Sequence, residues 1–142
     1  MRVAVLGQGG REHAIGCSLL KSPLVSEVLV IPGNPGMELD QKIKVLALDL
    51  NHFSELQTHL KRHEVNLVII GPENLLAQGL ADSLSQEGFL VVGPGRDLAQ
   101  LESSKAYAKA FMVRHEIPTA DFYKANSAQE ALRHLEHFPM SV

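Results

Sequence analysis

The sequence holds a single cysteine, Cys17, which excludes an internal disulfide framework. A chain of 142 residues does not need one, because it can bury most of its apolar surface without crosslinks or metals. A lone cysteine on an expected helix is more typical of a small core residue than of a nucleophile. We therefore expect one ordinary globular protein of a reducing compartment.

Long apolar runs and runs of basic charge are also missing. No apolar stretch approaches the roughly 20 residues of a membrane-spanning helix. The chain enters an expected strand directly after Met1-Arg2, without the apolar region of a signal peptide. The 13 Lys and Arg residues are dispersed and face 16 Asp and Glu, for a formal net charge of −3. We expect a cytoplasmic protein with no nucleic-acid or membrane partner.

What is present is the pattern of an α/β domain. Hydrophobic residues make up 45% of the chain, and short apolar runs alternate with segments in which apolar residues recur three or four positions apart. This pattern predicts a doubly wound parallel sheet with helices on both faces, over residues 1–94. The expected strands are Val3–Leu6, Val28–Ile31, Val45–Leu46, Leu67–Ile70 and Leu90–Val92, and the expected helices are Glu12–Lys21, Phe53–Arg62 and Leu75–Gln86.

The alternation ends after Gly95, so residues 95–142 are expected to form a separate, mostly helical linker segment. We expect helices at Arg96–Leu101, Ser103–His115 and Ser127–His137, a break at Ile117–Thr119, a strand at Asp121–Lys124 and the beginning of another at Met140–Val142. No stop signal follows this last strand.

Four loops follow the expected strands and carry most of the turn-forming residues. They are Gly7–Glu12, Pro32–Gly36, Gly71–Asn74 and Gly93–Gly95. Ligands of open parallel sheets bind outside the carboxyl ends of the strands. We therefore expect all four loops to face one crevice.

The first loop, in the stretch VAVLGQGGREH, fits neither common nucleotide fingerprint. Gly7 and Gly9 match the dinucleotide pattern G-x-G-x-x-G, but Glu12 stands at the third glycine. The acidic residue that this pattern needs after the second strand is replaced by Pro32-Gly33-Asn34. The P-loop pattern fails because no lysine follows the glycines. An NAD-dependent oxidoreductase is thus the least favoured alternative.

The same loop has the features of an anion site. Backbone N–H groups of Gly9, Gly10 and Arg11 at a helix N-terminus favour a phosphate, and the Arg11 guanidinium can add a bidentate contact. Glu12 and Glu73 would repel a bare phosphate, but they suit a ligand that also offers hydroxyls or an amine, such as a sugar phosphate. The alternatives are a plain βα turn with a solvated Arg11, a Glu12 that complements the helix dipole, and a Glu73 beside a helix N-cap. The seven histidines show no spacing typical of zinc ligands.

Six blocks of residues occur in order along nearly the whole chain. They are Gly7-x-Gly9-Gly10-Arg11-Glu12-His13-Ala14, Pro32-Gly33-Asn34-x-Gly36, Gly71-Pro72-Glu73 with Leu76 and Gly79, Gly93-Pro94, Gln100-Leu101-Glu102-x-Ser104-Lys105 and Ile117-Pro118-Thr119-Ala120. Together they closely resemble the N-terminal part of the phosphoribosylamine-glycine ligases, also called glycinamide ribonucleotide synthetases. The resemblance implies a Rossmann-like, pre-ATP-grasp domain over residues 1–94 and the beginning of a truncated ATP-grasp domain over residues 95–142.

The resemblance also implies an activity for the full-length enzyme. ATP, glycine and 5-phosphoribosylamine give glycinamide ribonucleotide, ADP and phosphate in purine biosynthesis, with glycine activated as an acyl phosphate in the presence of Mg²⁺ or Mn²⁺. The implied substrate-binding residues are Gly9, Gly10, Arg11, Glu12, Gly33, Asn34, Pro72 and Glu73, and the implied ATP-binding residue is Lys105. The resemblance implies no catalytic residue and no metal ligand within these 142 residues.

Two departures from the family pattern concern the loops, and a third concerns length. Pro35 and Met37 stand where the family has Ala and Thr, and Asn74-Leu75-Leu76 stands where it often has Ala-Pro-Leu. Members of the family continue for hundreds of residues, so we interpret the chain as a fragment that is inactive alone, holds neither ATP nor metal by itself and is prone to self-association. The alternative is a natural short sugar-phosphate-binding module without catalysis.

Overall fold

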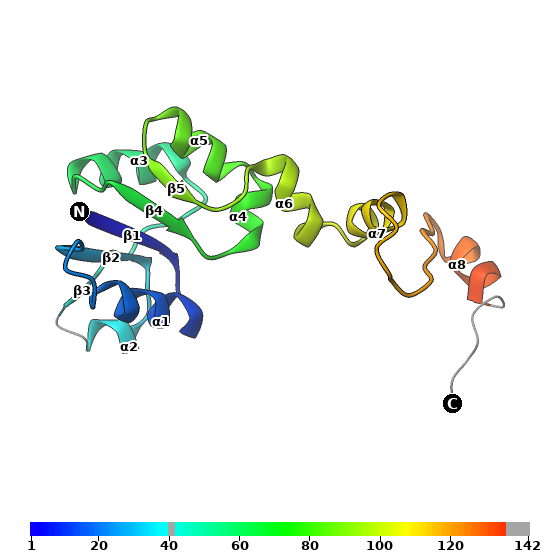
Figure 1. Cartoon of the computed structure of the whole chain (residues 1–142), viewed down its shortest axis with the longest axis horizontal. Coiled ribbons are helices and arrows are strands. Elements are labelled where there is room, and N and C mark those ends of the chain that lie inside the picture. The colour runs from blue at the N-terminus through cyan, green and yellow to red at the C-terminus, as the bar shows by residue number, and fades with distance from the viewer. Residues whose placement is uncertain (40–41, 136–142) are drawn as a thin grey trace. The chain divides into compact units, whose positions relative to one another are not determined.

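The computed structural model describes residues 1–39 and 42–135, and its first compact unit, Met1–Ser103, is built on a parallel sheet (Figure 1). In the described part of the chain the sheet has five strands in the order β3-β2-β1-β4-β5. The strands are β1 (Arg2–Gly7), β2 (Glu27–Pro32), β3 (Ile43–Val45), β4 (Leu67–Ile70) and β5 (Leu90–Val92). The helices of this unit are α1 (Gly10–Leu19), α2 (Pro35–Glu38), α3 (Phe53–Arg62), α4 (Glu73–Ala77), α5 (Leu80–Gln86) and α6 (Arg96–Ser103).

The central strands bury both of their faces, because successive side chains point to opposite sides of the sheet. In β1, Ala4 and Leu6 join a core cluster that includes residues of α3, α4 and α5. Val5, between them, joins a second cluster that contains Met37 of α2 and is flanked by residues of α1. Helices thus cover both faces, as Figure 1 also shows. The α/β class and the parallel, doubly wound sheet predicted from the sequence are confirmed.

Some elements differ in number or bounds from those expected from the sequence. The expected helix Leu75–Gln86 is two helices, because Gly79 adopts a left-handed φ of 90° between α4 and α5. Strand β3 begins at Ile43, earlier than the expected Val45–Leu46, because Ile43 already pairs with Val28 of β2. The short helix α2 was not anticipated, although Asn34 is a good N-cap for it and Pro35 a good first residue.

The first unit extends to Ser103 and so includes α6, whereas the sequence placed a boundary near Pro94. Helix α6 packs against α4 and α5, and its Ala99 is buried in the core cluster that those helices share. The amphipathic helix expected at Arg96–Leu101 is thus part of the α/β unit.

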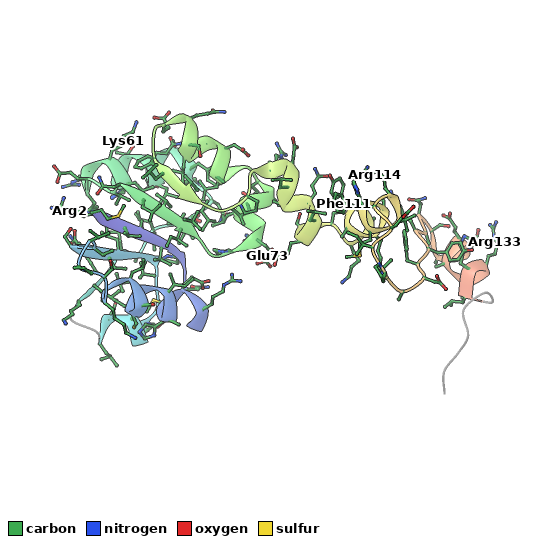
Figure 2. All side chains as sticks on the ribbon, in the orientation of Figure 1. Arg2, Lys61, Glu73, Phe111, Arg114 and Arg133 are labelled. Carbon is green, nitrogen blue, oxygen red and sulfur yellow. The ribbon has the colours of Figure 1, made fainter. Side chains whose placement is uncertain are left out.

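The second unit begins at Ser104 and contains α7 (Lys105–Arg114) and α8 (Ala128–Leu135). The side chain of Ser104 caps α7 by accepting a hydrogen bond from the Tyr107 N–H at 3.3 Å. The Arg114 guanidinium lies 5.4 Å from the centre of the Phe111 ring, and both side chains are labelled in Figure 2.

The strand expected at Asp121–Lys124 is wrong. An extended segment becomes a strand only when a neighbour pairs with its N–H and C=O groups, and no strand pairs with it among residues 42–135. Lys109 of α7 instead donates hydrogen bonds to the Thr119 Oγ1 at 2.6 Å and the Ala120 carbonyl at 2.8 Å. The strand expected at Met140–Val142 and the end of the helix expected at Ser127–His137 lie outside the described residues.

Candidate functional site

A cleft of about 510 Å³ lies at the carboxyl edge of the sheet. Leu6 of β1 pairs with Ile31 of β2 and with Ile70 of β4, so these three strands end at one level and their loops begin side by side. The cleft is lined by Gly7–Gly9, Arg11, Glu12, Pro32, Leu48–Asn51 and Pro72–Leu75. It therefore lies at the point in the sheet where β1 and β4 lead into helices on opposite faces, which is where such folds bind ligands.

Glu12 is a buried carboxylate at the base of the β1–α1 loop, with 5% of its surface exposed. Its Oε2 accepts a hydrogen bond from the Gly9 N–H at 2.8 Å, and its Oε1 accepts one from the Nε–H of Arg11 at 2.8 Å. The Nη2 of Arg11 donates in turn to the carbonyl of Gly71, after β4. The carboxylate and the guanidinium thus join the β1–α1 loop to the β4–α4 loop.

The glycines around Glu12 leave room for its side chain. A Cβ atom at Gly7 would lie 2.6 Å from Glu12 Cγ, and one at Gly9 would lie 2.9 Å from Oε2. A Cβ atom at Gly71 would overlap Oε1. Three glycines from two loops are therefore explained by the packing of one carboxylate.

Both members of the Arg11–Glu12 pair are stabilised in their charged forms. Burial alone would raise the pKa of Glu12, but hydrogen bonds from Arg11 and from the Gly9 N–H outweigh burial and lower that pKa. The hydrogen bond to Glu12 and its charge raise the pKa of Arg11. The Arg11 side chain is 60% exposed, so its outer N–H groups remain accessible from the cleft.

The structure brings five of the predicted site residues to the cleft: Gly9, Arg11, Glu12, Pro72 and Glu73. Glu73 is the first residue of α4, and its side chain is labelled in Figure 2. The other predicted residues of this unit, Gly10, Gly33 and Asn34, are not among the lining residues. Lys105 is the first residue of α7, in the second unit.

Asn34 acts on the glycine loop indirectly. Its Oδ1 accepts a hydrogen bond from the Met37 N–H at 3.2 Å and so caps α2. Its Nδ2 donates to the carbonyl of Gln8 at 2.7 Å, which ties the β2–α2 loop to the glycine loop. Gly33 has a φ of +70°, and a Cβ there would lie 2.7 Å from Val45 Cγ1. Both residues therefore shape the loops that carry the lining residues.

The loop Gly93–Gly95 does not line the cleft, which corrects the expectation that all four loops would face one crevice. It packs on α5 instead: the Arg96 N–H donates to Asp82 Oδ2 at 2.8 Å. A Cβ at Gly95 would lie 2.6 Å from Asp82 Oδ1. Gly95 is thus explained by packing on α5, whereas a Cβ at Gly93 would lie 2.8 Å from Leu76 Cδ2 of α4.

The cleft also has a wall that sequence reasoning missed, Leu48–Asn51 between β3 and α3. Asp49 Oδ1 accepts hydrogen bonds from the Asn51 N–H at 2.9 Å and the Asn51 side-chain amide at 2.8 Å. Its Oδ2 lies 3.2 Å from the Nδ1 of His52. The segment contains no glycine or proline, and the signals that could have pointed to it were the turn-forming types of Asp49 and Asn51 and the alternation of Leu46, Leu48 and Leu50.

Within residues 1–39 and 42–135, no group of three or more His, Cys, Asp and Glu side chains is arranged to hold a metal ion. No helix in the same residues is long and apolar enough to cross a membrane.

Comparison with known proteins gives consistent matches to one family. The family profile described as "Phosphoribosylglycinamide synthetase, N domain" matches residues 1–102. Phosphoribosylamine–glycine ligases from Pasteurella multocida and Escherichia coli K12 are 36% and 38% identical over 135 residues, which is 95% of this chain. The chain spans 32% of the length of each of these relatives.

Solved structures support the fold. The structure titled glycinamide-RNase-transformylase T from Mycobacterium tuberculosis gives a TM-score of 0.72 at 18% identity, over 96% of this chain and 39% of that one. The biotin carboxylase domain of a single-chain bacterial carboxylase gives a TM-score of 0.66 at 19% identity, over 96% and 34%. At such identities the likeness concerns architecture alone.

Proposed function

The chain belongs to the phosphoribosylglycinamide synthetase N-domain family, and we propose that its cleft binds the sugar phosphate substrate of a ligase that joins glycine to 5-phosphoribosylamine. In this proposal the chain supplies about the first third of such an enzyme, in keeping with its coverage of the relatives. The whole reaction consumes ATP and forms glycinamide ribonucleotide, a step of purine biosynthesis.

The observation that carries the proposal is the fixed position of Arg11. Its Nε–H is taken by Glu12 and one N–H of Nη2 is taken by the Gly71 carbonyl. A guanidinium has five N–H donors, so three are left for a ligand in the cleft. Gly10 and Arg11 are also the first residues of α1, whose backbone N–H groups have no acceptor inside the helix. These donors together suit a phosphate.

In this proposal Glu12 does not contact the ligand. Its two oxygens accept hydrogen bonds from Gly9 and Arg11, and its carboxylate is buried among glycines. We assign it the task of orienting Arg11. Glu73, which is exposed at the edge of the same cleft, is the better candidate for a contact with hydroxyl or amine groups of the substrate.

ATP, glycine and the divalent cation belong to the proposed whole enzyme. The described residues hold no metal cluster, and the ATP-binding role of Lys105 rests on the family resemblance alone. In this proposal the acyl-phosphate chemistry and its Mg²⁺ or Mn²⁺ belong to the parts of the relatives that this chain does not span, as the family resemblance implies.

A titration of the ¹⁵N-labelled chain with ribose 5-phosphate tests the proposal. We expect the amide signals of Gly9, Gly10 and Arg11 to shift first, and sulfate, which carries the charge without the sugar, to shift them as well. Arg11→Ala should weaken ribose 5-phosphate binding roughly 10 to 100-fold, because it removes charge-assisted hydrogen bonds.

Arg62→Ala is the matched control, since Arg62 is an exposed arginine at the end of α3 that does not line the cleft. It should leave the affinity unchanged. Equal affinity of wild type and Arg11→Ala for ribose 5-phosphate would contradict the assignment. NAD shifting the glycine loop at micromolar concentration would contradict it too.

A further inference from the structure

The chain crosses the carboxyl edge of the sheet between β3 and α3. Strand β3 lies at one edge of the sheet, and its Ile43 packs in the cluster on the α1 and α2 face. Leu56 and Leu60 of α3 pack in the opposite cluster, with residues of α5. The residues between them, Leu46–His52, therefore pass from one face to the other, as the trace between β3 and α3 in Figure 1 shows. We call Leu46–His52 the crossing segment.

The crossing segment is anchored by alternate leucines. Leu46, Leu48 and Leu50 are partly buried against the cluster that contains α3 and α5. Asp49, between two of them, has a side chain that is 53% exposed and lines the cleft together with Arg11. The apolar anchors on each side hold the backbone of Asp49 at the cleft wall.

The Asp49 carboxylate is oriented before any ligand arrives. Two N–H groups of Asn51 and the imidazole of His52 fix its two oxygens. The hydrogen bonds from Asn51, and then the charge of His52, lower the pKa of Asp49. An ionised carboxylate only accepts hydrogen bonds, with about two acceptor sites on each oxygen. Asn51 fills both sites of Oδ1, and His52 faces Oδ2, so the acceptor site left for a ligand is on Oδ2. A group held in this way loses little side-chain entropy on binding.

The cleft therefore has two kinds of polar wall. Arg11 offers N–H donors on the β1–α1 loop, and Asp49 offers an acceptor, its Oδ2, on the crossing segment. A ligand that carries a phosphate at one end and a hydroxyl group at the other matches both. We propose that Asp49 accepts a hydrogen bond from a ribose hydroxyl of a sugar phosphate whose phosphate is held by Arg11, an assignment that rests on the function proposed above.

The test compares the dissociation constants of inorganic phosphate and ribose 5-phosphate for the full chain, measured by amide-shift titration. The wild type should bind ribose 5-phosphate about tenfold more tightly than inorganic phosphate, which is the typical effect of hydrogen bonds to a charged acceptor. Asp49→Asn, which keeps the shape of the side chain, should lose most of this preference. Its affinity for inorganic phosphate should stay close to that of the wild type.

A control variant tests whether the effect is specific to Asp49. Glu55→Gln removes an exposed carboxylate of α3 that does not line the cleft. It should keep the preference for ribose 5-phosphate. Thermal unfolding of every variant checks that the fold is intact.

The outcomes for this inference and for the proposed function are distinct. If the wild type binds both ligands equally well, or if Asp49→Asn keeps the tenfold preference, the role of Asp49 is wrong while Arg11 can still hold the phosphate. If Arg11→Ala leaves the affinity for both ligands unchanged, the proposed function itself fails. Loss of the preference in Glu55→Gln as well would show that the preference does not depend on the Asp49 carboxylate in particular, and would also overturn the inference.

Discussion

At the scale of single residues, the carboxylate of Glu12 organises the glycine loop. It occupies the N-terminus of α1, where a negative charge is stabilised by the helix dipole, and it uses the Gly9 N–H that would otherwise be open to a ligand. An anion that enters the cleft therefore meets Arg11 before it meets the amide of Gly9. The buried charge is tolerated because both of its oxygens have partners.

Removing that charge should destabilise the first unit. Glu12→Gln keeps the shape of the side chain, but one carboxylate oxygen is replaced by an NH₂ group, which cannot accept a hydrogen bond, so either Gly9 or Arg11 loses its acceptor. We expect a loss of about 1 to 3 kcal/mol in the free energy of unfolding, measured by urea denaturation. Glu55→Gln, on an exposed helix face, is the control and should change it by less than about 0.5 kcal/mol. Equal effects of the two variants would contradict the assigned role of Glu12.

The stability difference between wild type and Glu12→Gln should also depend on pH. The pKa of Glu12 is lower in the folded protein than its ordinary value of roughly 4.3, so folding favours the ionised carboxyl. This contribution is fully present above about pH 4.3 and is lost as the pH falls through the folded-state pKa. The two unfolding curves should therefore differ at pH 7 and approach each other in acid. A difference that stays constant down to about pH 3 would argue against an ionised Glu12.

Gly71 should be intolerant of a side chain only while Glu12 is present. A Cβ at Gly71 would overlap Glu12 Oε1, and overpacking of this kind costs about 1 to 3 kcal/mol. Gly71→Ala should be strongly destabilising in the wild type and much less so in a Glu12→Ala background, which a double-mutant cycle measures. Gly10→Ala is the control, because nothing lies within 4 Å of a Cβ there. Additive effects of Gly71→Ala and Glu12→Ala would refute the packing argument.

The residue types at the site were predictable, but their contacts were not. The sequence placed Gly9, Arg11, Glu12 and Glu73 at one edge of a sheet, and the cleft contains all four. It could not show that the Glu12 carboxylate turns inward, because that depends on the distance between the β1–α1 and β4–α4 loops. The place of Asp49 in the cleft wall was hidden for the same reason, because it depends on the path of the chain between β3 and α3.

At the scale of secondary structure, the break between α4 and α5 lets two short helices follow one amphipathic pattern. Leu76, Leu80 and Leu84 recur at helical spacing, so the pattern predicts one helix, but Gly79 reverses the sign of φ between them. Helix α4 can then contact α6 while α5 contacts β5. Periodicity reports which residues face the core, and it does not report a change of helix axis.

Gly79 offers a direct test of this interpretation. A Cβ there would have room, since its nearest neighbour would be 3.7 Å away, so the left-handed φ of 90° is the main obstacle to a side chain. Gly79→Ala should therefore cost about 1 to 2 kcal/mol in the free energy of unfolding. Gly79→Asn should cost less, because asparagine tolerates this region better. If alanine is accepted without loss, the turn does not require the left-handed conformation.

The path of the crossing segment could not be predicted from the positions of the strand and helix on either side of it. The sequence located α3 correctly at Phe53–Arg62 and located a strand near Val45. Which side of the sheet α3 covers depends on packing between distant residues, such as Leu60 and Leu84 in the same cluster. Because α3 packs on the face opposite to α1, Leu46–His52 must cross the carboxyl edge of the sheet. The cleft wall that this segment forms therefore depends on the long-range packing of α3.

At the scale of the whole molecule, the two units differ in how much apolar surface they bury. The first unit contains both core clusters, and Val3–Leu6 of β1 and Val28–Ile31 of β2 are fully buried. Among the described residues of the second unit, Ala108 is the one buried hydrophobic residue. Val113, Leu132 and Leu135 are each more than half exposed. A segment with so little burial has a small hydrophobic contribution to offset the entropy of ordering its backbone.

Amide hydrogen exchange should therefore be slower in the first unit than in the second. Comparing one helix of each unit, α3 and α8, removes any effect of secondary-structure type. Helix α3 contributes Leu56 and Leu60, both fully buried, whereas α8 has no buried residue. Amides of α3 and of β4 should exchange only through large openings of the first unit, and amides of α8 should exchange through local opening at much smaller free energies. We expect protection factors in α8 to be lower by at least about two orders of magnitude, since each factor of ten corresponds to about 1.4 kcal/mol.

Protection of α8 equal to that of α3 in dilute solution would show that the second unit has a source of stability beyond its own buried side chains. A rise in α8 protection with protein concentration would identify that source as self-association, because only an intermolecular contact depends on concentration.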